Sequence, residues 1–133
     1  MATKTKTEQP VDDDDCPQCG QAKMVLRRRT LEVPVNRTRV RVPRALHYRC
    51  PKCDEVVYAM DQAAELQERA QAVYRARFKL LEPHEITATR TQHHLSQARL
   101  AVLIQAEVRL LERWEAGRLV QPPQIDRLLR MLR

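Results

Sequence analysis

The sequence predicts an α+β fold, in which a small metal-binding antiparallel β-sheet module is followed by a linking helix and an all-helical domain. Three observations support this prediction. Four cysteines fall in two C-x-x-C pairs. Between the pairs, apolar and polar residues alternate, which is typical of strands with one buried face. From Asp61 onward, apolar residues recur at the helical period. The 133 residues are therefore expected to form small modules joined by a helix.

Residues 1–15 are predicted to form a disordered tail. The stretch is polar and ends in the acidic run Asp12–Asp15, with nothing apolar to bury. The run could contact a basic partner or shield a basic surface, but a solvated tail is the favoured interpretation. No apolar stretch is long enough to cross a bilayer and no signal peptide is recognisable, so a cytoplasmic protein with reduced cysteines is expected.

Residues 16–60 form the expected metal-binding module. Two residues between ligands let both thiolates of a pair reach one ion, and each pair precedes a turn-forming residue, Gly20 or Asp54. Four thiolates in a tetrahedron suit one structural Zn²⁺ per chain, whereas an iron centre, disulfides and unrelated thiols are the alternatives. The expected ligands are Cys16, Cys19, Cys50 and Cys53. Such a site leaves no open position for water, so no enzyme is expected.

Three or four strands are expected between Lys23 and Arg49, with a last strand over 55–59. Pro34 and Pro43 are expected at sheet edges or strand ends. The alternating apolar positions are Met24, Leu26, Leu31, Val33, Val35, Val40, Val42, Leu46 and Tyr48. The opposite face carries Arg27, Arg29, Arg37, Arg39 and Arg41. A solubilising role for these arginines is favoured over nucleic-acid binding, because no aromatic residues stand among them to stack on bases.

Residues 61–81 are predicted to form the linking helix, which begins near Asp61 and is broken at Glu82-Pro83. Residues 82–133 are predicted to form the helical domain. Its four expected helices are Pro83–His93, Gln97–Ile104 with a cap at Ser96, Glu107–Ala116, and Gln124–Leu132. Short helices with short links predict a helix-turn-helix module. Spacing assigns to its core Leu100, Leu103, Ile104, Leu111 and Trp114.

The third of these helices carries the candidate nucleic-acid contacts. Arg109 and Arg113 are four residues apart and so share one helix face. An arginine there can bond a guanine edge, and the formal charge of +7 favours an acidic partner, nucleic acid first. Pairing within the helix with Glu112 or Glu115, or plain solvation, is the alternative interpretation.

Several motifs together resemble a known family. They are Cys16-Pro17-Gln18-Cys19-Gly20, Arg49-Cys50-Pro51-Lys52-Cys53-Asp54-Glu55, Leu80-Leu81-Glu82-Pro83-His84-Glu85-Ile86, Leu95-Ser96-Gln97, Arg113-Trp114-Glu115-Ala116-Gly117 and Asp126-Arg127-Leu128-Leu129-Arg130. From Cys16 to Arg133 the chain resembles the MqsA-type antitoxins, which have a YgiT-type zinc finger and an Xre-like DNA-binding domain.

This resemblance implies a structural zinc, a homodimer formed through the C-terminal domain, and binding to a palindromic operator in double-stranded DNA that represses the protein's own operon. It also implies a possible toxin partner, held by the N-terminal module. Gln97 matches a family position that often contacts the DNA backbone.

The chain departs from the family pattern around the recognition helix. His94 and Gln105 stand where glycines are usual, and Glu107 replaces a small polar cap. Leu110 and Glu112 fall on DNA-facing positions that are commonly Thr and Ser, and Leu110 is expected to be exposed there. These departures motivate a second hypothesis, a protein-interaction module that binds a toxin and has weakened or lost DNA binding.

Overall fold

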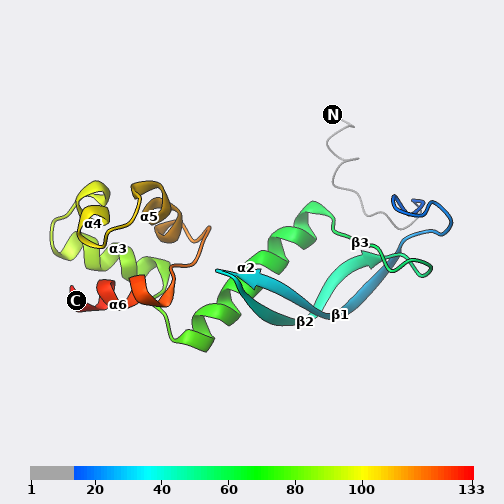
Figure 1. Cartoon of the computed structure of the whole chain (residues 1–133), viewed down its shortest axis with the longest axis horizontal. Helices are drawn as coiled ribbons and strands as arrows, with labels where there is room; N and C mark the ends of the chain where they lie inside the picture. The colour runs from blue at the N-terminus through cyan, green and yellow to red at the C-terminus, as the bar shows by residue number, and fades with distance from the viewer. Residues whose placement is uncertain (1–13) are drawn as a thin grey trace. The chain divides into compact units, whose positions relative to one another are not determined.

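The computed structural model describes residues 14–133, so most of the expected tail, including Asp12 and Asp13, lies outside the described residues. The described chain forms a three-stranded antiparallel sheet followed by five helices, which confirms the predicted α+β class (Figure 1). The elements are β1 Val25–Val35, β2 Thr38–Arg49, β3 Val56–Val57, α2 Met60–Phe78, α3 Pro83–Gln92, α4 Gln97–Leu103, α5 Val108–Glu115 and α6 Pro123–Met131.

Contacts divide the chain into two compact units. The N-terminal unit comprises the described residues up to 33 together with residues 39–70, and the C-terminal unit comprises residues 34–38 and 71–133. None of the helices within residues 14–133 is long and apolar enough to span a membrane.

The sheet is built on one long hairpin rather than on several short strands. β1 and β2 are joined by Asn36 and Arg37, whose φ angles are 50° and 70°. Two successive positive φ angles are the signature of a type I′ turn, whose twist matches that of paired strands. β2 is the central strand, but it pairs with β3 only at Tyr48 and Arg49.

Pro43 lies inside β2 and not at its end, so of the two expected positions, a sheet edge or a strand end, the structure shows the edge. Pro43 is tolerated because β3 does not extend to this part of β2, which leaves one side of the strand free of ladder hydrogen bonds. Arg69 of α2 donates to the carbonyl oxygens of Pro43 and Arg44 on this strand. Its guanidinium thereby supplies donors where the ladder supplies none.

The alternation of buried residues along β2 changes register at Arg44. This residue has a φ of 53°, a left-handed conformation typical of a bulge. Buried positions are Val40 and Val42 before it, but Ala45 and His47 after it. Leu46, which was assigned to the same buried face as Val42, is only half-buried.

α2 begins at Met60, where the side-chain oxygen of Gln62 accepts a hydrogen bond of 2.9 Å from the Ala59 N–H. It ends at Phe78, earlier than the predicted break at Glu82. The cause is Lys79, which has a φ of 55° and lets the Leu80 N–H donate to the Arg75 carbonyl at 2.9 Å. A left-handed residue followed by such a bond is a common way to end a helix.

The C-terminal unit packs α3 to α6 around one apolar core. Its buried members are Leu81, Ile86, Leu100, Ala101, Ile104, Leu111, Trp114 and Leu129. Two predicted environments are wrong. Leu103 is 56% exposed, and Leu110 is partly buried against this core instead of exposed. The buried stripe of α4 passes through residues 100, 101 and 104, so Leu103 lies to one side of it.

Candidate metal centre and nucleic-acid interface

The four cysteines meet at one point in the N-terminal unit. Their Sγ atoms all lie within 4.8 Å of one another, with Cys16 to Cys53 at 3.5 Å and Cys19 to Cys50 at 3.7 Å. These separations exceed the disulfide bond length of about 2.05 Å. A tetrahedron with metal–sulfur bonds of about 2.3 Å has edges of about 3.8 Å. The four thiols can therefore hold a single metal ion.

The first knuckle is shaped by its own backbone. The N–H groups of Gln18 and Cys19 donate to the Cys16 Sγ at 3.3 and 3.4 Å. The Gly20 N–H donates to the Cys16 carbonyl at 2.9 Å, and Gly20 has a φ of 64°. Glycine adopts this left-handed conformation at little cost, which closes the turn.

The second knuckle repeats this arrangement. Lys52 and Cys53 donate their N–H groups to the Cys50 Sγ at 3.3 and 3.4 Å, and Asp54 donates to the Cys50 carbonyl at 2.9 Å. Asp54 has a φ of 68°, and aspartate is among the few non-glycine residues that tolerate this region. Cys16 and Cys50, the first cysteine of each knuckle, are both buried in the unit's core.

The electrostatics of the cluster favour a bound cation. Burial tends to raise the pKa of Cys16, but the backbone N–H groups of Cys19 and Gln18 lower it to about 6. The Cys53 N–H lowers the pKa of Cys50. At Cys53 the backbone N–H of Glu55 lowers the pKa, but desolvation and the neighbouring thiols outweigh it and raise that pKa to about 12. Thiolates so close together repel one another, and a metal ion at their centre relieves this repulsion.

The exposed face of α5 forms a basic depression. Arg109, Glu112, Arg113, Ala116 and Arg118 line a hollow of about 260 Å³. Within residues 14–133, the side chains of these three arginines make no hydrogen bond or ion pair, so the alternative of pairing with Glu112 or Glu115 is not observed. The structure thus brings both predicted arginines to one site and adds Arg118, which the sequence analysis missed. Gly117 directly follows the predicted end of the helix at Ala116, and a glycine at that position is the sequence signal that the chain turns back there.

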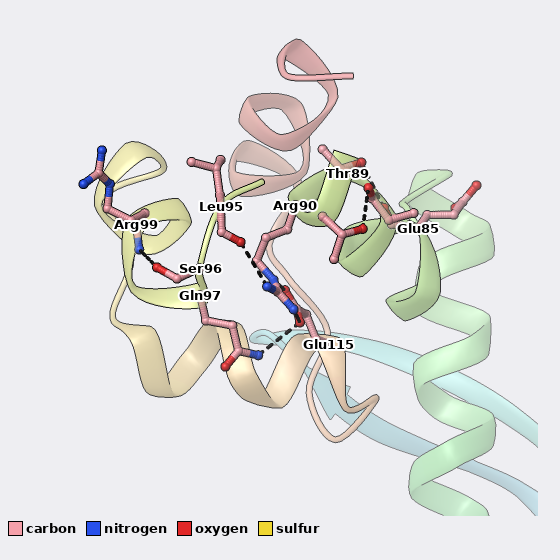
Figure 2. Close-up of polar contacts among 10 residues, drawn as sticks. Glu85, Thr89, Arg90, Leu95, Ser96, Gln97, Arg99 and Glu115 are labelled. Carbon is pink, nitrogen blue, oxygen red and sulfur yellow. Dashed lines mark hydrogen bonds and ion pairs between the residues drawn. The ribbon is translucent and has the colours of Figure 1, made fainter. Parts of the chain in front are cut away.

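Gln97 lies elsewhere, in a polar network that joins three helices (Figure 2). The Glu115 carboxylate accepts from Arg90 Nε at 2.8 Å and Nη2 at 3.1 Å, and from Gln97 Nε2 at 3.0 Å. Arg90 also donates to the Leu95 carbonyl at 3.1 Å. The bond to Glu115 raises the pKa of Arg90. The network fixes α3, α4 and α5 to one another, and it directs the Gln97 amide nitrogen inward.

The backbone retains the expected turns although the residues differ. His94 and Gln105, at the two positions where glycine was expected, both have a φ of 57°. Most side chains other than glycine, asparagine and aspartate are strained in this region. Glu107, in place of the small polar cap, starts α5 without a side-chain capping bond. The departures therefore lower local stability without changing the path of the chain.

Two comparisons with known proteins bear on the identity of the chain. A search of curated proteins finds none that match this chain. A family model described as "Antitoxin component of bacterial toxin-antitoxin system, MqsA" matches residues 14–133. The match includes both knuckles, the sheet and all five described helices. The chain therefore belongs to the MqsA antitoxin family.

Proposed function

We propose that this antitoxin binds its own operator as a homodimer, represses its operon, and carries one structural Zn²⁺ per chain. Membership of the family implies a toxin partner. The observation that supports DNA binding best is a set of exposed arginines at α5 and just beyond its end that find no partner among residues 14–133: Arg109, Arg113 and Arg118.

Several features of the C-terminal unit support the proposal that it is a helix-turn-helix DNA-binding module. α4 and α5 are joined by residues 104–107 and held by the buried bonds of Glu115 to Arg90 and Gln97. This leaves the face of α5 with Arg109 and Arg113 free to enter a major groove, where arginine recognises guanine O6 and N7. In a two-fold dimer formed through this unit, the two copies of α5 would read half-sites about 34 Å apart.

The metal centre acts as scaffold in this proposal. Four thiolates suit Zn²⁺, which has no redox chemistry of its own, and they leave it no open coordination position. The core that surrounds the site is small: its buried members are Cys16, Met24, Tyr48, Cys50 and Ala59. Because few apolar side chains surround the two knuckles, their folding depends in large part on the metal.

Fluorescence anisotropy with a labelled duplex from the protein's own promoter tests DNA binding, with a shuffled duplex of equal length for comparison at physiological salt. The wild type is expected to prefer its promoter. The double variant Arg109→Ala, Arg113→Ala is expected to lose that preference. Arg127→Ala, which removes an exposed arginine on α6, is the matched control. Equal wild-type affinity for the two duplexes would overturn the proposal.

A second candidate function is toxin binding with weakened or lost DNA binding. Its support in the structure is a group of exposed apolar side chains at the junction of α4 and α5: Val102, Leu103 and Val108. These residues replace Leu110 as the candidate protein contact, because Leu110 packs against the core. Co-purification of the neighbouring gene's product tests this function. Leu103→Arg is expected to abolish capture, and Met131→Arg, at another exposed apolar residue, is expected to preserve it.

A further inference from the structure

Of the described residues that line the basic depression of α5, Glu112 is the one with a carboxylate. It is exposed, lies next to Arg113 and is one helical turn from Arg109, yet its carboxylate makes no hydrogen bond or ion pair with any part of the described chain. Three unpaired arginines around an unpaired carboxylate give the surface donors and an acceptor at the same time. Base edges present both donors and acceptors, whereas phosphates present acceptors only. The combination therefore suits base edges better than it suits a row of phosphates.

We infer that Glu112 reads the exocyclic amine of a cytosine in the operator, while the neighbouring arginines bind guanine and phosphate. The inference deepens the proposed DNA-binding function and rests on it. It specifies part of the operator: each half-site carries a C·G pair where the middle of α5 meets the major groove.

The chemistry of the groove leads to cytosine by elimination. A carboxylate facing phosphate is repelled, so at this surface it is compatible with DNA only where it meets a donor. The major groove offers two amine donors, cytosine N4 and adenine N6. Adenine places its acceptor N7 beside the amine, and thymine contributes the acceptor O4, both of which repel a carboxylate. Cytosine has no acceptor on its own major-groove edge, and its guanine partner presents two acceptors to arginine.

Arg118 has a different position and a different expected role. It follows Gly117, whose φ is 78°, and its own N–H donates to the Arg113 carbonyl at 2.9 Å. Gln71 Nε2 donates to the Arg118 carbonyl at 2.8 Å, which fixes its backbone. The residue therefore stands at the C-terminal end of α5, whereas base contacts are made mainly from the N-terminal part of a recognition helix. Its unpaired guanidinium suits a backbone phosphate.

The test measures affinities for a panel of promoter duplexes in which each base pair of the half-site is replaced in turn. The wild type is expected to have one C·G pair whose replacement by T·A or A·T weakens binding about 5- to 150-fold. Glu112→Gln is expected to shift the preference at that pair to adenine, because an amide offers both a donor for N7 and an acceptor for the amine. Arg118→Ala is the contrast: it is expected to weaken binding to all duplexes equally and to lower the salt slope by about one.

The outcomes separate this inference from the function on which it rests. If Glu112→Gln keeps the wild-type preference at every position, or only strengthens binding to all duplexes alike, Glu112 does not read a base and the inference is overturned while DNA binding stands. If the wild type itself prefers no sequence, the proposed function fails and the inference fails with it. Circular dichroism of each variant confirms that the helices are intact.

Discussion

Replacing Glu115 by Gln is expected to destabilise the C-terminal unit by about 3 kcal/mol. The Glu115 side chain is 7% exposed and that of Arg90 is 18% exposed, and the two make a bidentate pair. Removing one partner of a buried pair typically costs about 3–5 kcal/mol, because the other charge stays buried without compensation. The lower end applies here, since a glutamine oxygen can still accept one bond from Arg90.

Trp114 provides the assay, because it is the only tryptophan of the chain and lies buried in α5 beside Glu115. Urea unfolding followed by its fluorescence reports the free energy of unfolding of the C-terminal unit. Glu112→Gln is the matched control: the same chemical change at an exposed, unpaired carboxylate of the same helix is expected to cost less than about 0.5 kcal/mol. Equal effects of the two substitutions would refute the argument that the buried pair holds α3 and α5 together. The double replacement Arg90→Met, Glu115→Leu is expected to cost less than Glu115→Gln, because it leaves no buried charge without a partner and only the bonds to Gln97 and the Leu95 carbonyl are lost.

Three further predictions concern the metal and the turns. Under the proposal of one zinc per chain, Cys50→Ser or acidification is expected to release that ion and unfold the N-terminal unit, because bound thiols must be deprotonated. Metal analysis and near-ultraviolet circular dichroism measure this, and a metal-free variant with an unchanged spectrum would contradict it. Gln105→Gly is expected to stabilise the C-terminal unit by about 1 kcal/mol, because it removes the strain of a left-handed backbone at a residue with a side chain. Gln105→Ala keeps that strain and is expected to give no such stabilisation. Equal melting temperatures of the two variants would count against strain. Glu107→Thr is expected to add about 1 kcal/mol through a capping bond to the start of α5, which urea unfolding measures; Glu107→Ala, which removes the charge without adding a cap, is its control.

Local signals predicted much of the fold. The start of α3 follows from Pro83 and the start of α4 from Ser96, while the end of α5 follows from Gly117, because caps and breakers act over a few residues. The two knuckles follow from ligand spacing for the same reason. Tertiary packing determines which residues of α4 and α5 face the core. For this reason Leu103 is exposed while Leu110 is covered.

Contacts distant in sequence could not be predicted in this way. Arg90 and Glu115 are 25 residues apart, and no local pattern pairs them. The buried carboxylate of Asp126 likewise accepts from the Leu81 N–H and Gln121 Nε2, both at 2.9 Å, which ties α6 to the segment before α3. β2 can continue through Pro43 because β3 does not pair with this part of the strand. Where β3 pairs is a property of the whole sheet, so the sequence of β2 alone does not predict it.

The strained turns are relevant to whether the exposed face of α5, where residues depart from the family pattern, still has a function. His94 and Gln105 keep a left-handed backbone without glycine, at a cost of about 1–2 kcal/mol each. Between these residues, Ser96 caps α4 and Gln97 bonds Glu115, so tertiary contacts impose the path. Because these contacts hold α4 and α5 in place despite the strain, the face of α5 that carries Arg109 and Arg113 stays exposed. Glu112, which stands where the family commonly has serine, then changes the chemistry displayed on that face. Under the proposed function, this substitution alters which operator is read while the supporting helices keep their positions.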